Sequence, residues 1–183
     1  MILRYATTIL MAIILAAVAA VGVSATQPQM AEAADTVTVT GCTGTSIVLD
    51  LNEKAMLDLH NKQRATQGLK ALCVHPALQR AAEAHSQDMM DKDYFAHNSQ
   101  DGTTFAQRIK REGYNYRAAG ENIAWGSGSL GSPDSIFKNW MNSPGHKANI
   151  MNKSYREVGI GAVAGTYQSY AGATMWTADF GTR

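Results

Sequence analysis

Cysteine is scarce in this sequence. Only two of the 183 residues are cysteines, Cys42 and Cys73, and they do not form a Cys-x-x-Cys pair. A thiolate zinc site or a dithiol redox motif needs paired cysteines at short spacing, so the sequence argues against both.

Three other absences narrow the possible functions. No long basic run exists and the formal net charge is +1, which argues against a nucleic-acid binder. Walker and dinucleotide glycine motifs are also missing, since Gly126-x-Gly128 and Gly159-x-Gly161 are incomplete. No Gly-x-Ser-x-Gly elbow supports a serine hydrolase, although Ser143 lies shortly before His146.

The N-terminus predicts export. Arg4 precedes an apolar run from Ile9 to Val23, and small residues follow. This pattern indicates a signal peptide over residues 1–25, with cleavage after residue 25 or as late as residue 34. An uncleaved membrane anchor is the alternative, because the run approaches the length that a bilayer needs. In either case we expect the remainder to be extracellular.

The cysteine count fits an exported protein. An even number of cysteines outside the cell favours one disulfide, here between Cys42 and Cys73. Two free thiols are the alternative. A disulfide would join the N-terminal arm to the folded domain.

The chain is expected to form one domain, over residues 46–183, after a linker or short edge strand within residues 26–45. Strands are predicted at residues 120–125, 158–162 and 174–180, and the last two form an antiparallel hairpin. Several helices followed by late strands predict an α+β fold. Capping residues and prolines mark four helix starts, at Asp50–Glu53, Pro76, Thr103 or Thr104, and Ser132–Pro133.

Two histidines stand in functional positions. His146 follows a Ser143-Pro144 turn and should lie in the first turn of a short helix. His97 lies on a polar loop, where functional side chains concentrate. Glu121 is anomalous because it shares a strand face with apolar residues. His85 lies on an apolar helix face and is interpreted as a core histidine with satisfied hydrogen bonds.

Together these residues resemble the CAP superfamily of cysteine-rich secretory, antigen-five and pathogenesis-related proteins, in its exported bacterial branch. The resemblance covers about residues 57–180, and the order and spacing of its pieces make it specific. The pieces are His60–Arg64 with Gly68-Leu69, Ala81–Met89, Phe95–His97 with Asp101-Gly102, Arg108, Gly113-Tyr114, Gly120–Ala124 and Trp140–Ile150.

The resemblance implies an α-β-α sandwich with a small three-stranded antiparallel sheet flanked by helices. It also implies a cleft that contains His97, His146 and Glu121, to which we add Asn122 and Ser143 as ligand-binding residues. A second glutamate, found in eukaryotic members, is missing near Asn142, which weakens any mechanism that needs two carboxylates.

Two functions follow from this cleft. We expect a protein that binds a ligand or a divalent metal such as Zn²⁺ through His97 and His146, without defined catalysis. The alternative is a weak metal-dependent hydrolase of the protease type, in which Glu121 is a ligand or the general base. A simpler alternative is that His97 and Glu121 hydrogen-bond each other and hold the cleft together.

Partners are predicted only by class. The resemblance implies such classes, because eukaryotic relatives bind sterols or fatty acids and some are secreted ligands for other proteins. The candidates are therefore a lipid, an envelope polymer and an extracellular protein. An apolar groove would contain Tyr114, Tyr116, Trp125 and Met151, although core packing also explains these residues. We expect a monomer.

Overall fold

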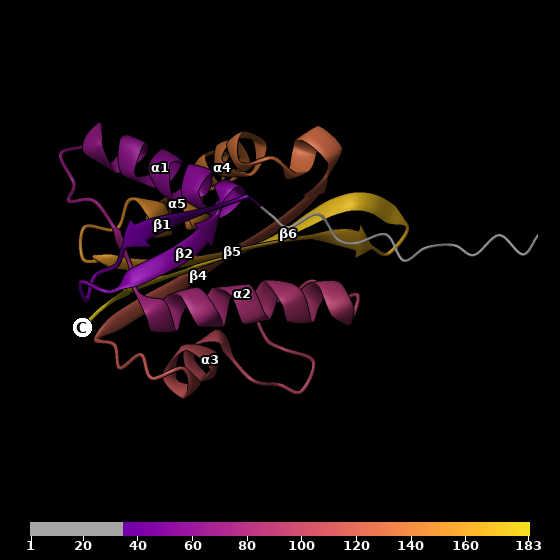
Figure 1. The fold of residues 1–183 in the computed structure, drawn as a ribbon, viewed down its shortest axis with the longest axis horizontal. Coiled ribbons are helices and arrows are strands. Elements are labelled where there is room, and N and C mark those ends of the chain that lie inside the picture. The colour runs from indigo at the N-terminus through magenta and orange to yellow at the C-terminus, as the bar shows by residue number, and fades with distance from the viewer. Residues whose placement is uncertain (1–34) are drawn as a thin grey trace, which may run out of the picture. The chain divides into compact units, whose positions relative to one another are not determined.

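The computed structural model describes residues 35–183, so the predicted leader over residues 1–25 and its later cleavage point at residue 34 lie outside them. The described part is a mixed α+β fold with a central sheet and helices on both faces (Figure 1). The predicted α+β class is confirmed, whereas the predicted sandwich with a three-stranded antiparallel sheet is matched only in part. The helices are α1 (Leu51–Ala65), α2 (Pro76–Asp91), α3 (Phe105–Arg111), α4 (Pro133–Asn142) and α5 (Pro144–Ile150), with a short 3₁₀ helix at Gly128–Gly131.

The central sheet has four strands in the order β3-β5-β6-β4. β6 pairs antiparallel with β4 and with β5, while β3 pairs in parallel with β5. The predicted count of three strands was therefore wrong. β3 has only two residues, too few to show periodicity in the sequence. The strands are β3 (Cys73–Val74), β4 (Ala118–Ser127), β5 (Glu157–Tyr167) and β6 (Tyr170–Thr182).

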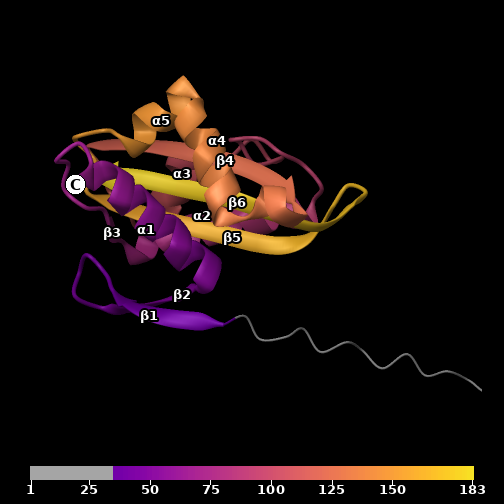
Figure 2. The same ribbon diagram turned by 90° about the horizontal axis from the view of Figure 1, so that it is seen from above.

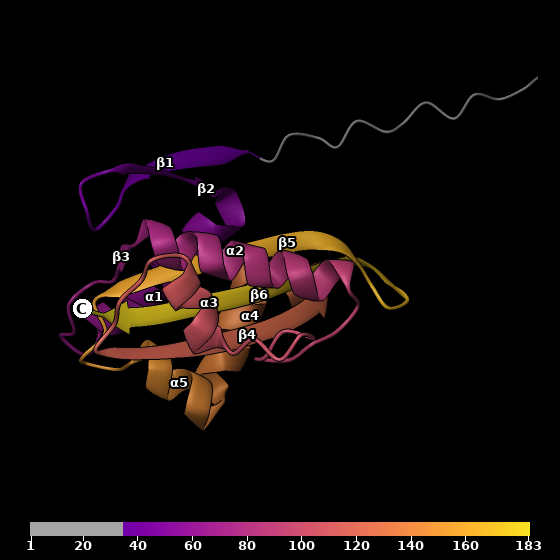
Figure 3. The same ribbon diagram turned by 90° about the horizontal axis from the view of Figure 1, so that it is seen from below.

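The two faces of the sheet differ in chemistry. α1, α4 and α5 lie on one face and α2 and α3 on the other (Figures 2 and 3). Trp176 and Phe180 of β6 belong to the main apolar core on the α1 and α4 side. Their neighbours Thr177 and Asp179 alternate onto the α2 face and are fully buried there. That face therefore contains polar groups that need partners.

Local signals start the helices as predicted. Asp50 and Glu53 form a capping box at α1, and Thr104 forms one with Gln107 at α3. Pro76, Pro133 and Pro144 each occupy the first turn of a helix. Proline suits this position because its missing N–H would have no partner in the helix.

Two glycines let α2 approach the sheet closely. A Cβ added at Gly159 would lie 2.0 Å from the carbonyl carbon of Leu78, and one at Gly161 would lie 2.5 Å from that of Ala82. Such distances exclude any side chain unless the helix moves away. The Gly159-x-Gly161 pattern is thus explained by packing between β5 and α2.

The N-terminal arm is a hairpin joined to the sheet by a disulfide. β1 (Thr36–Thr40) and β2 (Ser46–Asp50) form a separate antiparallel pair. The sequence left a linker or a short edge strand open for this segment, and β1 is a short strand within it. Cys42 in the turn is bonded to Cys73 of β3, which confirms the predicted disulfide.

Arg64 connects α1 to the segment that follows α5. Its buried guanidinium donates hydrogen bonds to the carbonyl oxygens of Ile150 at 2.8 Å, Asn152 at 3.0 Å and Tyr155 at 3.0 Å. The bond to Ile150 satisfies a carbonyl group that the end of α5 leaves open, and the other two fix the segment that follows. Arg64 therefore helps to set the position of α5, which contains His146.

No helix in residues 35–183 combines the length and the apolar character that a membrane span requires.

Candidate functional site

His97 is presented by the loop between α2 and α3, and several bonds hold this loop in place. His85 lies 3.0 Å from the carbonyl oxygen of Ala96 through Nε2, and Arg108 donates to the carbonyl oxygen of His97 at 2.8 Å. Tyr94 donates to Asp88. The side chain of His97 itself is 54% exposed. These bonds therefore hold the backbone of the loop in place, while the imidazole of His97 faces solvent.

Glu121 of β4 holds the His97 ring. Its carboxylate is 1% exposed, and its Oε1 lies 2.8 Å from Nδ1 of His97. Its Oε2 forms an ion pair with Arg108 of α3. Both oxygens are therefore engaged, and the predicted alternative of a hydrogen bond between His97 and Glu121 is what the structure shows.

Asn122 serves the other histidine. It follows Glu121 in β4, so its side chain points to the opposite face of the sheet. Its Nδ2 donates to the backbone carbonyl of His146 at 3.0 Å, and its Oδ1 accepts from Asn149 at 2.8 Å. Asn122 thus ties α5 to the sheet rather than offering its amide to a ligand.

His146 lies in the first turn of α5, as predicted. Partial burial lowers the pKa of its imidazole, and repulsion from His97 lowers it further. The two rings therefore act on each other electrostatically, from opposite sides of β4, which is an edge strand of the sheet. A lowered pKa keeps His146 neutral near pH 7, with a ring nitrogen available to a ligand.

Ser143 occupies the predicted N-cap position of α5. Within residues 35–183, however, its hydroxyl makes no capping hydrogen bond to that helix. The backbone before Pro144 is extended there, as proline requires of its predecessor. The position follows from the sequence, and the structure shows no role for the hydroxyl.

Two buried ionisable side chains of the site, those of Arg108 and Asp179, were not predicted as site residues. Arg108 belongs to the family-like pieces, but its pairing with Glu121 depends on how α3 packs. Asp179 of β6 lies directly opposite Glu121 in the ladder. Burial, and then the charge of Glu121, raise the pKa of Asp179 well above its usual range. The strand pattern already separates Asp179 from the apolar face of β6, and this is the only sequence signal for it.

His85 is a core histidine, but its hydrogen bonds are only partly satisfied. Burial lowers its pKa to about 4, so the ring is neutral. Nε2 therefore donates to Ala96, whereas Nδ1 has no partner among residues 35–183. The prediction of a core position is right, and the prediction of full satisfaction is not.

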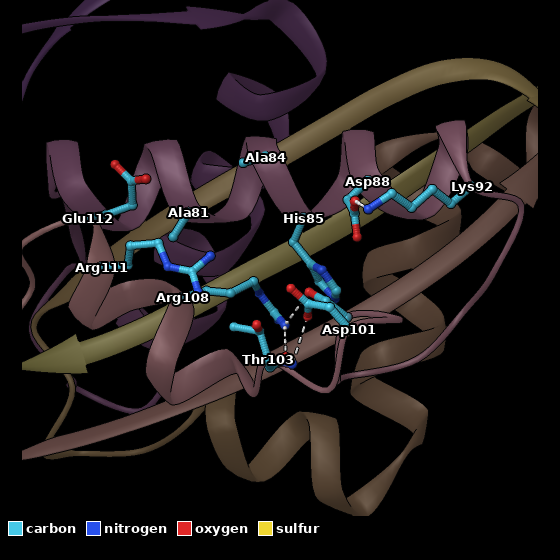
Figure 4. Close-up of a pocket in the computed structure, with 11 residues that line it drawn as sticks. Ala81, Ala84, His85, Asp88, Lys92, Asp101, Thr103, Arg108, Arg111 and Glu112 are labelled. Carbon is cyan, nitrogen blue, oxygen red and sulfur yellow. Dashed lines mark hydrogen bonds and ion pairs between the residues drawn. The ribbon is translucent and has the colours of Figure 1, made fainter.

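A polar cavity of about 260 Å³ adjoins the site between α2, α3 and the loop that precedes α3. Figure 4 shows His85 reaching down from α2 and Arg108 reaching across from α3 toward Asp101 and Thr103. Arg108 therefore belongs both to the wall of this cavity and to the ion pair with Glu121.

The site does not fit a catalytic zinc centre. Such centres generally take three protein ligands, and no three His, Cys, Asp or Glu side chains of residues 35–183 come close enough to hold one ion. Glu121 is already bound on both oxygens. The imidazoles of His97 and His146 are what remains for a metal.

The predicted aromatic groove is not formed. Tyr114 and Tyr116 pack in one cluster beside α3, Trp125 packs in a second, and Met151 lies against the main core. These side chains pack in three different clusters, because the segments that carry them lie in different parts of the fold.

Comparison with known proteins identifies the family of this chain. Residues 57–180 match the model of the cysteine-rich secretory protein family, abbreviated CAP. The chain belongs to this family, over the span that the sequence resemblance predicted.

Two curated relatives come from Bacillus subtilis. The uncharacterized protein YkwD is 39% identical over 128 residues, which are 70% of this chain and 46% of YkwD. The uncharacterized membrane protein YlbC is 33% identical over 110 residues, which are 60% of this chain and 31% of YlbC. The chain thus spans less than half the length of either relative.

Solved structures share the fold. An extracellular protein of Bacillus anthracis with an SCP domain has a TM-score of 0.62 at 29% identity, covering 72% of this chain and 40% of that one. An outer surface protein of Borrelia burgdorferi also has a TM-score of 0.62, at 21% identity, covering 72% of this chain and 92% of its own. At 21% identity, the similarity to the Borrelia protein shows only that the two proteins share a fold.

Proposed function

We propose that this protein is an extracellular CAP-domain binding protein. Its ligand is held by His97 and His146 at the outer edge of β4, either directly or through a divalent cation such as Zn²⁺. One observation carries this proposal: both oxygens of Glu121 are engaged, one by His97 and the other by Arg108. A carboxylate in that state orients an imidazole and is a poor general base or third metal ligand. Binding is therefore favoured over protease-like hydrolysis.

The hydrogen bond from His97 determines which ring nitrogen faces the ligand. A carboxylate can only accept, so Nδ1 of His97 carries the proton and Nε2 presents a lone pair outward. Carboxylates commonly orient metal-binding histidines in this way. With a neutral His146 nearby, the site offers two imidazole nitrogens, which suits a cation such as Zn²⁺ with its other positions open to a ligand.

Two features of the chain and one relative support an extracellular location. The pattern of residues 1–25 predicts a signal peptide. The disulfide between Cys42 and Cys73 is typical of oxidising compartments. The Bacillus anthracis relative is itself described as extracellular.

A calorimetric titration with Zn²⁺ tests the proposal. The protein should be metal-free and the buffer non-coordinating and near neutral pH, because imidazole binds metal only when deprotonated. We expect one site, lost in His97→Ala and in His146→Ala. The control His75→Asn changes a histidine that caps α2 and keeps a capping side chain, so it should bind as the unaltered protein does.

Two other outcomes would contradict parts of this proposal. Binding that both site variants retain, or no binding, would exclude the metal route and leave direct binding of lipids, envelope polymers or proteins to be tested with the same variants. A hydrolytic activity that a chelator abolishes and His146→Ala removes would instead support the hydrolase alternative.

A further inference from the structure

Asp179 and Glu121 form a buried pair of carboxyl groups. They are direct partners in the register of β4 and β6, so their side chains lie on the same face of the sheet. On its other side Asp179 is opposite Gly159 of β5, which has no side chain. Asp179 is fully buried and the carboxylate of Glu121 nearly so.

The two carboxyl groups differ in their hydrogen-bond partners. Glu121 interacts with His97 and Arg108. No N–H or O–H group of residues 35–183 donates to either oxygen of Asp179. An ionised carboxylate that is buried without donors is costly, and such a group takes up a proton instead.

The charges around the pair lead to the same conclusion. Arg108 on α3 supplies one fixed positive charge, and it is paired with Glu121. His85 on α2 is neutral, because burial lowers its pKa to about 4. His97, on the loop between α2 and α3, is half-exposed and donates to Glu121. One cation therefore faces two carboxyl groups, and a buried site of this kind favours one carboxylate and one carboxylic acid.

We propose that Asp179 is a positioning residue of the site: it is protonated in the folded protein and its hydroxyl donates a hydrogen bond to Glu121. Glu121 then accepts from Asp179, Arg108 and His97 together. This arrangement fixes the carboxylate against His97 and keeps the proton of His97 on Nδ1. The raised pKa of Asp179 agrees with this assignment. The inference depends on the contact between Glu121 and His97 and is independent of which ligand the site binds.

Two spectroscopic measurements on the protein expressed from the full chain test this proposal. Infrared spectroscopy with carbon-13 aspartate detects a protonated carboxyl group near neutral pH. Magnetic resonance of isotope-labelled histidine reports which ring nitrogen of His97 carries the proton. We expect a carboxylic-acid band that disappears in Asp179→Asn, and His97 protonated on Nδ1 in both proteins, because the asparagine amide still donates to Glu121.

The variant Asp179→Leu distinguishes a role of Asp179 in positioning Glu121 from a role in packing alone. Leucine has a similar size but donates nothing, so His97 should lose its single tautomer and show a mixture, while Asp179→Asn restores the native signal. The proposal is overturned if the unaltered protein shows no protonated aspartate near neutral pH, or if His97 keeps its tautomer in Asp179→Leu. Should Asp179→Leu fail to fold, the infrared comparison with Asp179→Asn still decides. Neither readout requires ligand or metal, so a failure of the binding proposal would be recognised separately.

Discussion

Glu121 and Asn122 are neighbours in β4, and each holds one of the two histidines of the site. Glu121 bonds the ring of His97 on one face of the sheet, and Asn122 bonds the backbone of His146 on the other. The alternation of side chains along a strand makes this division possible. The edge strand therefore acts as the common support of two segments that are far apart in the sequence.

The ion pair between Arg108 and Glu121 should be essential for stability. Arg108→Met would leave the carboxylate of Glu121 buried without its cation, which we expect to lower the free energy of unfolding by roughly 3–5 kcal/mol. The control is Arg80→Met, which breaks a largely exposed pair with Glu112 and should cost about 0–1 kcal/mol. Urea unfolding measures both. Equal effects of the two substitutions would show that burial does not matter here.

Asn122→Ala should release α5 from the sheet. The substitution leaves the carbonyl of His146 without the Asn122 donor and removes one of the two acceptors of the Asn149 amide, at a cost of about 1–3 kcal/mol. Hydrogen exchange should speed up in residues 143–151 and stay unchanged in α2. Asn142→Ala, at the exposed end of α4, is the matched control and should leave exchange in α5 as it was. A similar increase in both variants would contradict the assignment.

Glu53 should make stability depend on pH. Burial, and then the charge of Asp50, raise the pKa of Glu53 from 4.5 to about 8. The folded state therefore holds a proton that the unfolded state has lost between these values. The stabilising effect is complete below pH 4.5 and is lost as pH rises to about 8, at up to about 1.4 kcal/mol per pH unit.

Glu53→Gln removes this titration and keeps a side chain that can accept from the backbone of Asp50. Its stability relative to the unaltered protein should rise with pH, as urea unfolding at several pH values would show. A difference in stability that is constant with pH would mean that folding does not shift the pKa of Glu53.

The disulfide should contribute through the unfolded state. It links residues 31 positions apart, which in the chain-entropy model is worth about 3–4 kcal/mol. Reduction should raise the intact mass by two hydrogens and lower the unfolding temperature. The double variant Cys42→Ser with Cys73→Ser should match the reduced protein and no longer respond to reductant. An unchanged mass on reduction would exclude the bond in solution.

Local signals in the sequence predicted much of the scaffold. Capping residues at Asp50 and Thr104 and prolines at positions 76, 133 and 144 act on neighbouring backbone groups, so their effect can be seen without a fold. The position of His97 on a loop and of His146 at a helix start followed from the same reasoning. β3 was missed because two residues carry no period.

The sequence by itself determined where the helices begin, which strands alternate, and which family the chain resembles. Only the tertiary structure decided that Glu121 faces Asp179, that Arg108 neutralises Glu121, and that Asn122 supports His146 from the opposite face. The physical reason is the distance along the chain over which each interaction acts. Capping and periodicity act over a few residues, whereas strand register and helix packing bring together groups separated by tens of residues, and a shift of one residue in register would place Asp179 against a different partner.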